Sequence, residues 1–328
     1  MKTAFSFALI LGLAFVGTLT LIVLLLRLAP GLMLLDRPNE RSLHAHPRRK
    51  VGGLAMMIVV LALAMWLDVP SVVIVAAAFL TVISAIDDVR SLPALVRLVS
   101  HVGAACVVII AIPSGNLFLS ALAVASIAWM CDLYNFMDGA DGLAGGMTVI
   151  GFGALALAAN LAGSVDLAGW CAVISAAGLA FLFFNFPPAK VFMGDAGSVP
   201  LGFLAAALGY VGFSKEVWPF WYPALVFAPF ICDASLTLFK RLFRGEPLWI
   251  AHREHLYQRL ILSGWSHRRL CLVAYVLMFA VSVGAFAALN QPLTVQAAII
   301  AVVVFGLGGI FWVAERYVFS RRMILERK

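Results

Sequence analysis

Long uninterrupted runs of apolar residues restrict what this chain can fold into more than any other feature. A helix needs about 20 mostly apolar residues to cross a bilayer core of about 30 Å, and such runs recur along the whole of the 328 residues. Hydrophobic side chains make up 63% of the chain and charged side chains only 12%, which excludes a soluble globular domain. The sequence therefore predicts an all-α, polytopic membrane protein, with residues 1–328 in a single integral membrane domain.

The apolar runs predict about eleven transmembrane helices, several of them short. The first run includes Arg27 near its end and has no small-residue cleavage site, so we interpret it as a retained helix and not as a signal peptide. The expected helices span residues 4–29, 52–67, 71–86, 98–112, 117–131, 143–163, 168–186, 198–213, 218–239, 270–289 and 293–314.

Basic residues are concentrated in alternate connections between these runs. One set of segments holds 20 of the chain's 23 lysines and arginines. The positive-inside rule places that set and the C-terminus in the cytoplasm, and the N-terminus on the periplasmic side. A net charge of +7 then fits anionic headgroups and anionic substrates, and no nucleic-acid partner is expected. The set comprises loops 30–51, 87–97, 132–142, 187–197 and 240–269 and the C-terminal residues 315–328.

Acidic residues occur in three of the loops that this topology places on one membrane face. Asp87 and Asp88 end the third span, residues 135–146 read NFMDGADGLAGG, and residues 192–198 read FMGDAGS. Taken singly, each segment is also consistent with a solvated helix end or a turn. Together, unpaired like charges destabilise a fold unless a cation neutralises them. Oxygen ligands without a Cys or His quartet favour Mg²⁺, with Mn²⁺ as the alternative.

A basic segment in the last large loop provides a second candidate site. Residues 251–260 read AHREHLYQRL, which puts His252 and His255 on one face if the segment is helical. With Arg253 and Arg259 these histidines are suited to hold a diphosphate. A basic juxtamembrane helix on anionic lipid is the alternative interpretation. The first loop, residues 36–50, leaves the same two interpretations open.

The order of these motifs resembles a known family, the polyprenyl-phosphate N-acetylhexosamine-1-phosphate transferase superfamily (glycosyltransferase family 4). The resemblance runs from about residue 36 to 260 and rests on Asp87-Asp88, NFMDGADGLAGG, NFPPAKVFMGDAGS at 185–198 and HREH at 252–255. DRPNERSLH and HREHLYQRL are most similar to the subgroup that initiates O-antigen chains on undecaprenyl phosphate.

The resemblance implies a Mg²⁺-dependent enzyme in the bacterial cytoplasmic (inner) membrane, with a cytoplasmic active site and commonly a homodimeric assembly. Such an enzyme transfers an N-acetylaminosugar-1-phosphate from a UDP-N-acetylhexosamine to undecaprenyl phosphate and releases UMP. The product starts an O-antigen or related cell-envelope polysaccharide. Which amino sugar is transferred stays open, because a few hydrogen bonds decide it.

The same resemblance implies roles for individual residues. The implied catalytic residues are Asp87, Asp88, His252, Arg253 and His255; the implied metal ligands are Asp195 and Asp138; and the implied substrate-binding residues are Asn135, Asp138, Asp141, Asn185, Lys190 and Arg259. Whether Asp87 or Asp88 acts as a base or positions the lipid phosphate stays open, because that phosphate is already largely a dianion at neutral pH. A covalent aspartyl-phosphate intermediate is a further alternative.

Two other protein classes share parts of this pattern. Secondary transporters also contain intramembrane charges, but they bind substrate near the bilayer midplane, whereas these acids lie at one edge. A CDP-alcohol phosphotransferase has a DG-rich motif that requires an arginine soon after its first DG. Here Leu143-Ala144-Gly145 follow the DGADG sequence, so the sequence favours the transferase.

Overall fold

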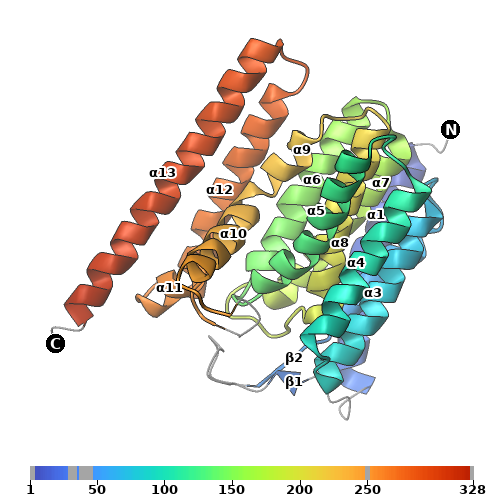
Figure 1. The fold of residues 1–328 in the computed structure, drawn as a ribbon. Helices are drawn as coiled ribbons and strands as arrows, with labels where there is room; N and C mark the ends of the chain where they lie inside the picture. The colour runs from blue at the N-terminus through green and yellow to red at the C-terminus, as the bar shows by residue number, and fades with distance from the viewer. Residues whose placement is uncertain (1–3, 29–34, 37–46, 248–251, 326–328) are drawn as a thin grey trace.

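The computed structural model describes residues 4–28, 35–36, 47–247 and 252–325, and helices account for most of them (Figure 1). Nine helices in these ranges are long and apolar enough to cross a membrane. The prediction of an all-α polytopic membrane protein is confirmed. The nine are α1 (Ala4–Leu28), α3 (Ser71–Arg90), α4 (Ala94–Ala111), α5 (Leu117–Phe136), α6 (Leu143–Leu161), α7 (Val165–Asn185), α8 (Asp195–Ser214), α12 (His267–Ala288) and α13 (Leu293–Leu325).

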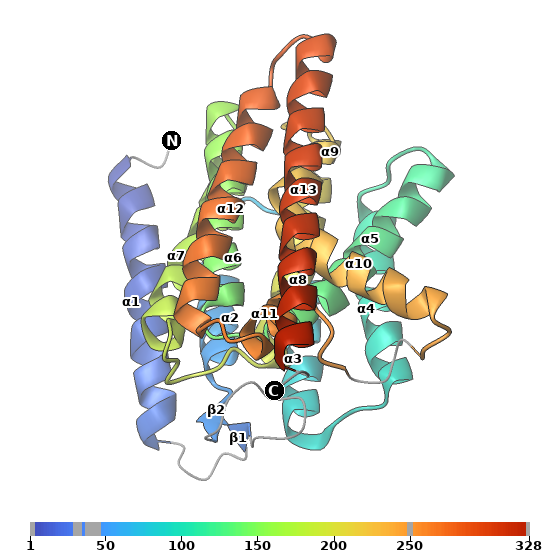
Figure 2. The same ribbon diagram turned by 90° about the vertical axis from the view of Figure 1, so that its left-hand side faces the viewer.

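The two remaining expected spans differ from the prediction. Helix α2 (Gly52–Ala64) is apolar but has only 13 residues. The continuous helix expected at 218–239 is wrong, because the chain forms α9 (Trp221–Val226) and then α10 (Ala228–Phe243). Pro229 in the first turn of α10 has no N–H to continue the α9 hydrogen bonds. Helix α10 therefore leaves the bundle at an angle (Figure 2).

Several helix boundaries also differ from the expected ones. Helix α3 extends to Arg90, so Asp87 and Asp88 lie in its last turns and not in a loop. Helix α8 begins at Asp195 and not at residue 198, and α13 continues to Leu325, well beyond residue 314. The loop expected at 240–269 contains a short helix, α11 (Leu256–Leu262). Polar residues at helix ends caused these errors, since they were assigned to loops.

Helix α8 lies at the centre of the bundle. In the most apolar stretch of α8, 89% of the residues are buried inside the protein, whereas the corresponding share in α13 is 6%. Helices α3 and α5 pack directly on α8. A Cβ at Gly202 would lie 2.1 Å from the carbonyl oxygen of Met130, so only glycine permits this approach of α8 to α5. The core helix thus begins with Asp195 at one end of the bundle.

A two-stranded hairpin closes that end. Strands β1 (Leu35–Asp36) and β2 (Arg48–Arg49) pair antiparallel, with Leu35 opposite Arg49 and Asp36 opposite Arg48. The hairpin lies at the same end as α11, the end of α3 and the start of α8 (Figure 1). The chain segments that contain the acidic motifs therefore meet beside it.

Candidate active site

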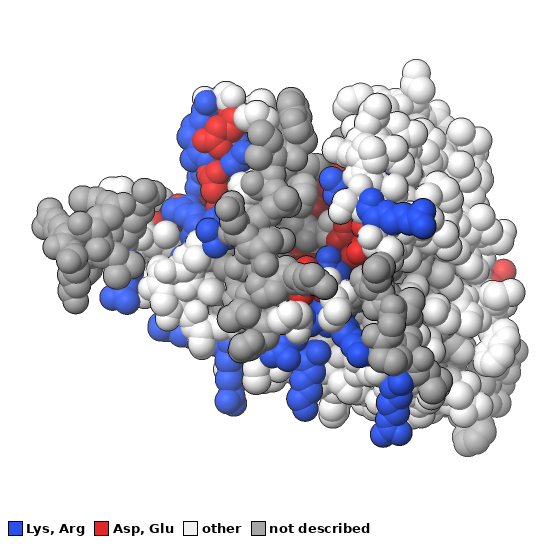
Figure 3. Space-filling view, turned by 90° about the horizontal axis from the view of Figure 1, so that it is seen from below, with Lys and Arg blue, Asp and Glu red and all other residues white. Residues whose placement is uncertain are grey.

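Charged side chains gather on the end of the molecule that carries the hairpin. Lysines and arginines project from this face and acidic side chains are visible between them, whereas the flank to the right is almost uncharged (Figure 3). The helix ends described above place the candidate site at this end. Side-chain contacts within it show which of the predicted residues the fold brings together.

Asp88 joins helix α3 to the start of α8. Its Oδ2 accepts the backbone N–H of Ala196 at 2.9 Å, and its Oδ1 lies 3.5 Å from Nζ of Lys50. The Asp88 side chain has no solvent exposure. Gly194, at φ +73°, precedes α8, and a Cβ there would lie 2.8 Å from Asp88 Oδ2. The approach of these two segments therefore requires glycine.

Lys50 is a site residue that the sequence-based predictions did not single out. Its ammonium lies 3.5 Å from carboxylate oxygens of both Asp36 and Asp88. Burial lowers the pKa of Lys50, but Asp88, Asp36 and Asp195 raise it more, so the pKa lies above its ordinary value. Lys50 therefore stays charged. The signal in the sequence was a basic residue two positions before the glycine pair Gly52-Gly53.

Backbone pairing over a long sequence distance puts Lys50 in this place. Phe192 donates its N–H to the carbonyl of Arg49 at 2.9 Å, and Gly53 donates its N–H to the carbonyl of Met193 at 3.0 Å. A Cβ at Gly53 would lie 2.4 Å from the Cα of Gly197. Residues 49–53 therefore lie against the segment that leads into Asp195.

Asp87 and Asp195 complete the carboxylate group. Asp87 is 9% exposed, accepts the backbone N–H of Leu92, and lies 3.7 Å from Nη1 of Arg97. The carboxyl groups of Asp87 and Asp195 are within hydrogen-bonding reach of each other. We refer to Asp87, Asp88, Asp138 and Asp195 as the carboxylate cluster.

Asp138, the fourth member of the cluster, follows shortly after the end of α5, and Asn135 lies in the last turn of that helix. Ser198 of α8 donates its hydroxyl to Oδ1 of Asn135 at 2.8 Å, and Asp138 donates its N–H to the Asn135 carbonyl at 3.1 Å. Burial raises the pKa of Asp138 well above its ordinary value, and Asp195 and Asp88 raise it further. Carboxyl groups are thus concentrated here, and Lys50 lowers the pKa of Asp138 by less than burial and the neighbouring acids raise it.

Asp141 and its neighbour Gly142 form a separate hydrogen-bonded centre. Asp141 Oδ2 accepts the N–H of Ala189 at 3.0 Å, which ties loop 137–142 to the loop before α8. Asn185 accepts the N–H of Gly142 at 2.8 Å and donates to the carbonyl of Val191 at 3.0 Å. Both polar groups of the Asn185 side chain are therefore engaged in joining loops. Lys190, in contrast, is solvent-exposed.

Helix α12 holds the same loop from the other side. The N–H of Asp141 donates to Nδ1 of His267 at 3.1 Å, Cys271 donates to the carbonyl of Asp141 at 2.7 Å, and Tyr275 donates to the carbonyl of Gly142 at 2.7 Å. Spacing of four residues puts these three side chains on one face of α12. No sequence motif indicated this stripe, because its partners are backbone atoms about 130 residues away.

The histidine segment lies beside the end of α5. The rings of His252 and His255 are 4.9 Å apart, and His255 stacks on Phe136 at 5.8 Å. The segment is not helical at the two histidines, since α11 begins only after His255, so helical spacing is not what brings them together. They meet because His255 is the N-cap residue of that helix and the chain turns before it.

A buried carboxylate holds this segment in place. Asp233 of α10 is 4% exposed and accepts the N–H groups of Leu256 at 2.7 Å and Tyr257 at 3.0 Å. An acidic group at a helix N-terminus satisfies backbone donors that have no partner in the helix. Tyr257 in turn donates its hydroxyl to the carbonyl of Phe136 at 2.9 Å.

The arginines of this loop have different surroundings. Arg253 is exposed, and Arg259 contacts Glu315 on α13 at 2.8 Å. Neither contacts the carboxylate cluster through a hydrogen bond or ion pair within residues 47–247. Ala251 and residues 37–46, which include most of the DRPNERSLH segment, lie outside the described residues.

Comparison with known proteins identifies the family. The model of glycosyl transferase family 4 matches residues 70–212. A probable undecaprenyl-phosphate N-acetylglucosaminyl 1-phosphate transferase of Bacillus subtilis is 31% identical, over 79% of this chain and 78% of the relative. A decaprenyl-phosphate N-acetylglucosaminephosphotransferase of Mycobacterium tuberculosis is 30% identical, over 90% of this chain and 87% of the relative. The undecaprenyl-phosphate alpha-N-acetylglucosaminyl 1-phosphate transferase of Escherichia coli K12 is 26% identical, over 80% of this chain and 78% of the relative.

The chain belongs to glycosyl transferase family 4. It is therefore a multi-pass membrane enzyme of the polyprenyl-phosphate N-acetylhexosamine-1-phosphate transferase superfamily, as the motifs predicted. The residues that the family 4 model matches run from α3 to α8 and contain the whole carboxylate cluster. Lys50, the histidine segment and the α12 stripe lie outside the matched residues.

Lowering the pH is expected to destabilise this family 4 enzyme in part through His252. Burial, His255 and Arg241 lower the pKa of His252 from 6.5 to about 4. Between these values the unfolded chain takes up a proton at His252 while the folded chain does not. The free energy of unfolding therefore falls as the pH falls through this window, and His252→Gln makes that fall less steep.

The measurement is the apparent Tm of the purified protein in detergent across that pH window. Arg253→Gln is the matched control, because its side chain is exposed and an arginine does not titrate there. It is expected to keep the wild-type slope. If the apparent Tm of His252→Gln changes with pH as steeply as that of the wild type, the assignment of a lowered pKa to His252 is contradicted.

Proposed function

We propose that this family 4 enzyme transfers an N-acetylaminosugar-1-phosphate from a UDP-N-acetylhexosamine to undecaprenyl phosphate, releasing UMP. The observation that carries the proposal is the meeting of Asp87, Asp88, Asp138 and Asp195 with Lys50 at one end of the helix bundle. The relatives named above act on undecaprenyl or decaprenyl phosphate and transfer N-acetylglucosamine 1-phosphate. We therefore place UDP-N-acetylglucosamine first among the donors.

The proposed setting is the cytoplasmic face of a bacterial inner membrane. Most lysines and arginines of the chain fall in the same alternate connections of the sequence as the acidic motifs, and the positive-inside rule favours the cytoplasm for such segments. UDP-sugars are cytoplasmic, which agrees with that orientation. Motif likeness to O-antigen initiators supports a role in starting O-antigen or a related cell-envelope polysaccharide.

The proposal includes Mg²⁺, and the residues present fit it. Within the described residues, Asp88 Oδ1 is buried and receives no hydrogen bond, and Asp138 lies among other carboxylates. A cation would relieve both conditions. No three Asp, Glu, His or Cys side chains in the described ranges form a complete set of metal ligands. Mg²⁺ commonly takes one or two carboxylates and completes its coordination with water and substrate phosphates.

In this mechanism Asp195 and Asp138 would hold Mg²⁺, which when bound offsets the diphosphate charge and stabilises UMP as it leaves. A lipid phosphate oxygen attacks the sugar-bearing phosphorus, and the bond between that phosphorus and the UMP oxygen breaks. The lipid phosphate is largely a dianion at neutral pH, so no base has to remove a proton. Asp88, held by Ala196 and Lys50, then positions the reacting groups, and Lys50 offers a charged donor to a phosphate oxygen.

The test is UMP release by purified protein in detergent with undecaprenyl phosphate, Mg²⁺ and a panel of UDP-N-acetylhexosamines. Release that needs the lipid and the metal supports the proposal, and the fastest donor identifies the sugar. EDTA is expected to stop the reaction and added Mg²⁺ to restore it. Folded protein that releases no UMP with any donor would refute the proposal, and substrate uptake into sealed vesicles would then test the transporter alternative.

A further inference from the structure

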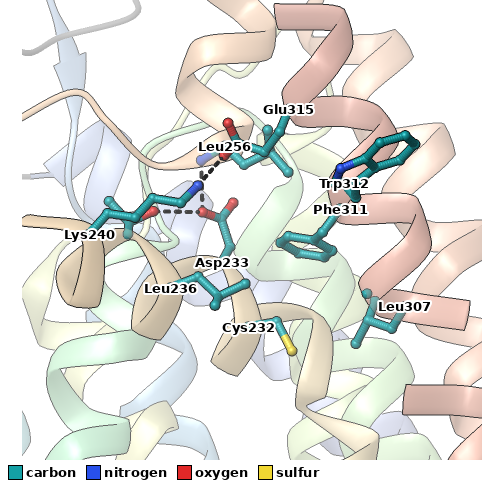
Figure 4. Close-up of a pocket in the computed structure, with 11 residues that line it drawn as sticks. Cys232, Asp233, Leu236, Lys240, Leu256, Leu307, Phe311, Trp312 and Glu315 are labelled. Carbon is teal, nitrogen blue, oxygen red and sulfur yellow. Dashed lines mark hydrogen bonds and ion pairs between the residues drawn. The ribbon is translucent and has the colours of Figure 1, made fainter. Parts of the chain in front are cut away.

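A glutamate on the last helix receives two basic side chains from two other elements. Lys240 of α10 places Nζ 2.7 Å from Oε1 of Glu315 (Figure 4). Arg259 of α11 places Nη1 2.8 Å from both oxygens of the same carboxylate. Glu315 thereby links α10, α11 and α13, although it lies outside the residues that the family model matches.

Helices α10 and α13 do not pack closely against each other. A cavity of about 360 Å³ separates them, lined by Cys232, Leu236, Leu307, Phe311 and Trp312 among others (Figure 4). Helix α13 packs mainly against α12 and α11. The Lys240–Glu315 ion pair at the polar end of the cavity therefore links α10 directly to α13, and hydrogen bonds between charged groups are stronger than neutral ones.

Helix α11 is held at both ends by carboxylates from different helices. Asp233 of α10 accepts the first N–H groups of α11, at Leu256 and Tyr257. Glu315 of α13 holds Arg259 near the other end. A helix of seven residues is too short to be stable without such contacts. The two acids therefore help to set its orientation, together with the buried side chains of Leu256, Tyr257 and Leu260.

The orientation of α11 determines where the histidines lie. His255 directly precedes α11 and stacks on Phe136, and Tyr257 donates to the Phe136 carbonyl. Asp138 of the carboxylate cluster is two residues further along. A shift of α11 would therefore move His252 and His255 relative to the cluster.

We infer that Glu315 is a positioning residue for the transfer reaction, acting through Arg259 to hold α11 and the histidine segment against the end of α5. This inference rests on the proposed function. Glu315 touches no cluster residue in the described part of the chain. The effect of Glu315 on the reaction is therefore indirect. Its carboxylate binds Arg259, and Arg259 belongs to α11.

The experiment compares Glu315→Gln with the wild type in the UMP-release assay. A displacement of the reacting groups by about 1 Å can slow a reaction by roughly 100-fold. We therefore expect kcat/KM of Glu315→Gln to be lower than that of the wild type by roughly 10-fold to 100-fold. Glu315→Asp keeps the charge but shortens the side chain, and it should give a smaller loss. Arg316→Gln is the matched control on the same helix. Its guanidinium lies over Trp312, and its activity should stay within about 2-fold of the wild type.

A double variant separates positioning from substrate contact. It combines Arg259→Gln with Glu315→Gln. If Arg259 acts through Glu315, the double variant should be no slower than the slower of the two single variants, because each substitution removes the same interaction. Multiplied losses would overturn the inference, since Arg259 would then have an independent contact with substrate.

Hydrogen exchange of residues 256–262 provides a readout that needs no activity. Glu315→Gln is expected to speed exchange in α11, and Arg316→Gln is not. A wild type that releases no UMP would refute the proposed function, while the exchange result would still decide whether Glu315 holds α11. An active wild type, with Glu315→Gln equal to it in both rate and exchange, would overturn the inference alone.

Discussion

Asp195→Asn is expected to lower kcat/KM for UMP release by about 10³-fold or more, equivalent to about 4 kcal/mol of transition-state stabilisation. Asp195 is the first residue of the most buried helix, and it lies against Asp87 and Asp88. Asparagine keeps the shape of the side chain but removes the charge that a divalent cation requires. The loss should therefore appear in catalysis and metal dependence while the protein remains folded.

The measurement is initial rate against Mg²⁺ concentration for the wild type and Asp195→Asn, with the apparent Tm of each. We expect the remaining activity of the variant to need more Mg²⁺. Asp68→Asn is the matched control, because Asp68 is exposed and lies between α2 and α3, away from the cluster. A variant with a third or more of the wild-type rate and an unchanged Mg²⁺ dependence would exclude Asp195 as the main metal ligand.

Lys50→Met is expected to lower kcat/KM by about 10²-fold to 10³-fold, the usual cost of removing one donor that stabilises a transition state. Methionine has a similar length but no charge, so Asp36 and Asp88 lose their shared counter-ion. The repulsion that remains should also lower the apparent Tm. Added Mg²⁺ should raise the Tm of the variant more than that of the wild type, because the metal replaces part of the lost charge.

Lys215→Met is the control for Lys50→Met, since Lys215 is exposed at the far end of α8. It should keep wild-type activity and stability. If Lys50→Met keeps its activity but loses stability, Lys50 only neutralises the acids and does not contact a phosphate. If it keeps both, the role assigned to Lys50 is wrong.

The carboxylate cluster was largely predictable from the sequence. Charges in or beside membrane helices are costly, so Asp87, Asp88 and Asp195 stood out against the apolar background. Alternation of basic and neutral loops then placed all three on one face. The roles of these residues in metal and substrate binding stay predictions that the variants above test.

Lys50 and Asp233 illustrate what could not be predicted. Lys50 reaches Asp88 because Arg49 of β2 forms a single bridge with Val191, and a pairing this short leaves no periodic pattern in the sequence. Asp233 belongs to none of the motifs described above, yet its carboxylate holds the start of α11 from 23 residues away. Both contacts depend on backbone positions that are remote in the chain.

The sequence by itself determined the membrane-spanning helices, the end of the bundle where the acids gather, and the family. The length of an apolar run and the charge of a loop are local properties of the sequence, and each decides separately whether its segment crosses the bilayer. Only the tertiary structure decided that the helix at residues 218–239 breaks before Pro229 and that α12 holds Asp141. It alone also showed that Glu315 contacts Arg259 of α11. These features depend on close packing and hydrogen bonds between distant segments, which form only once the helices have assembled.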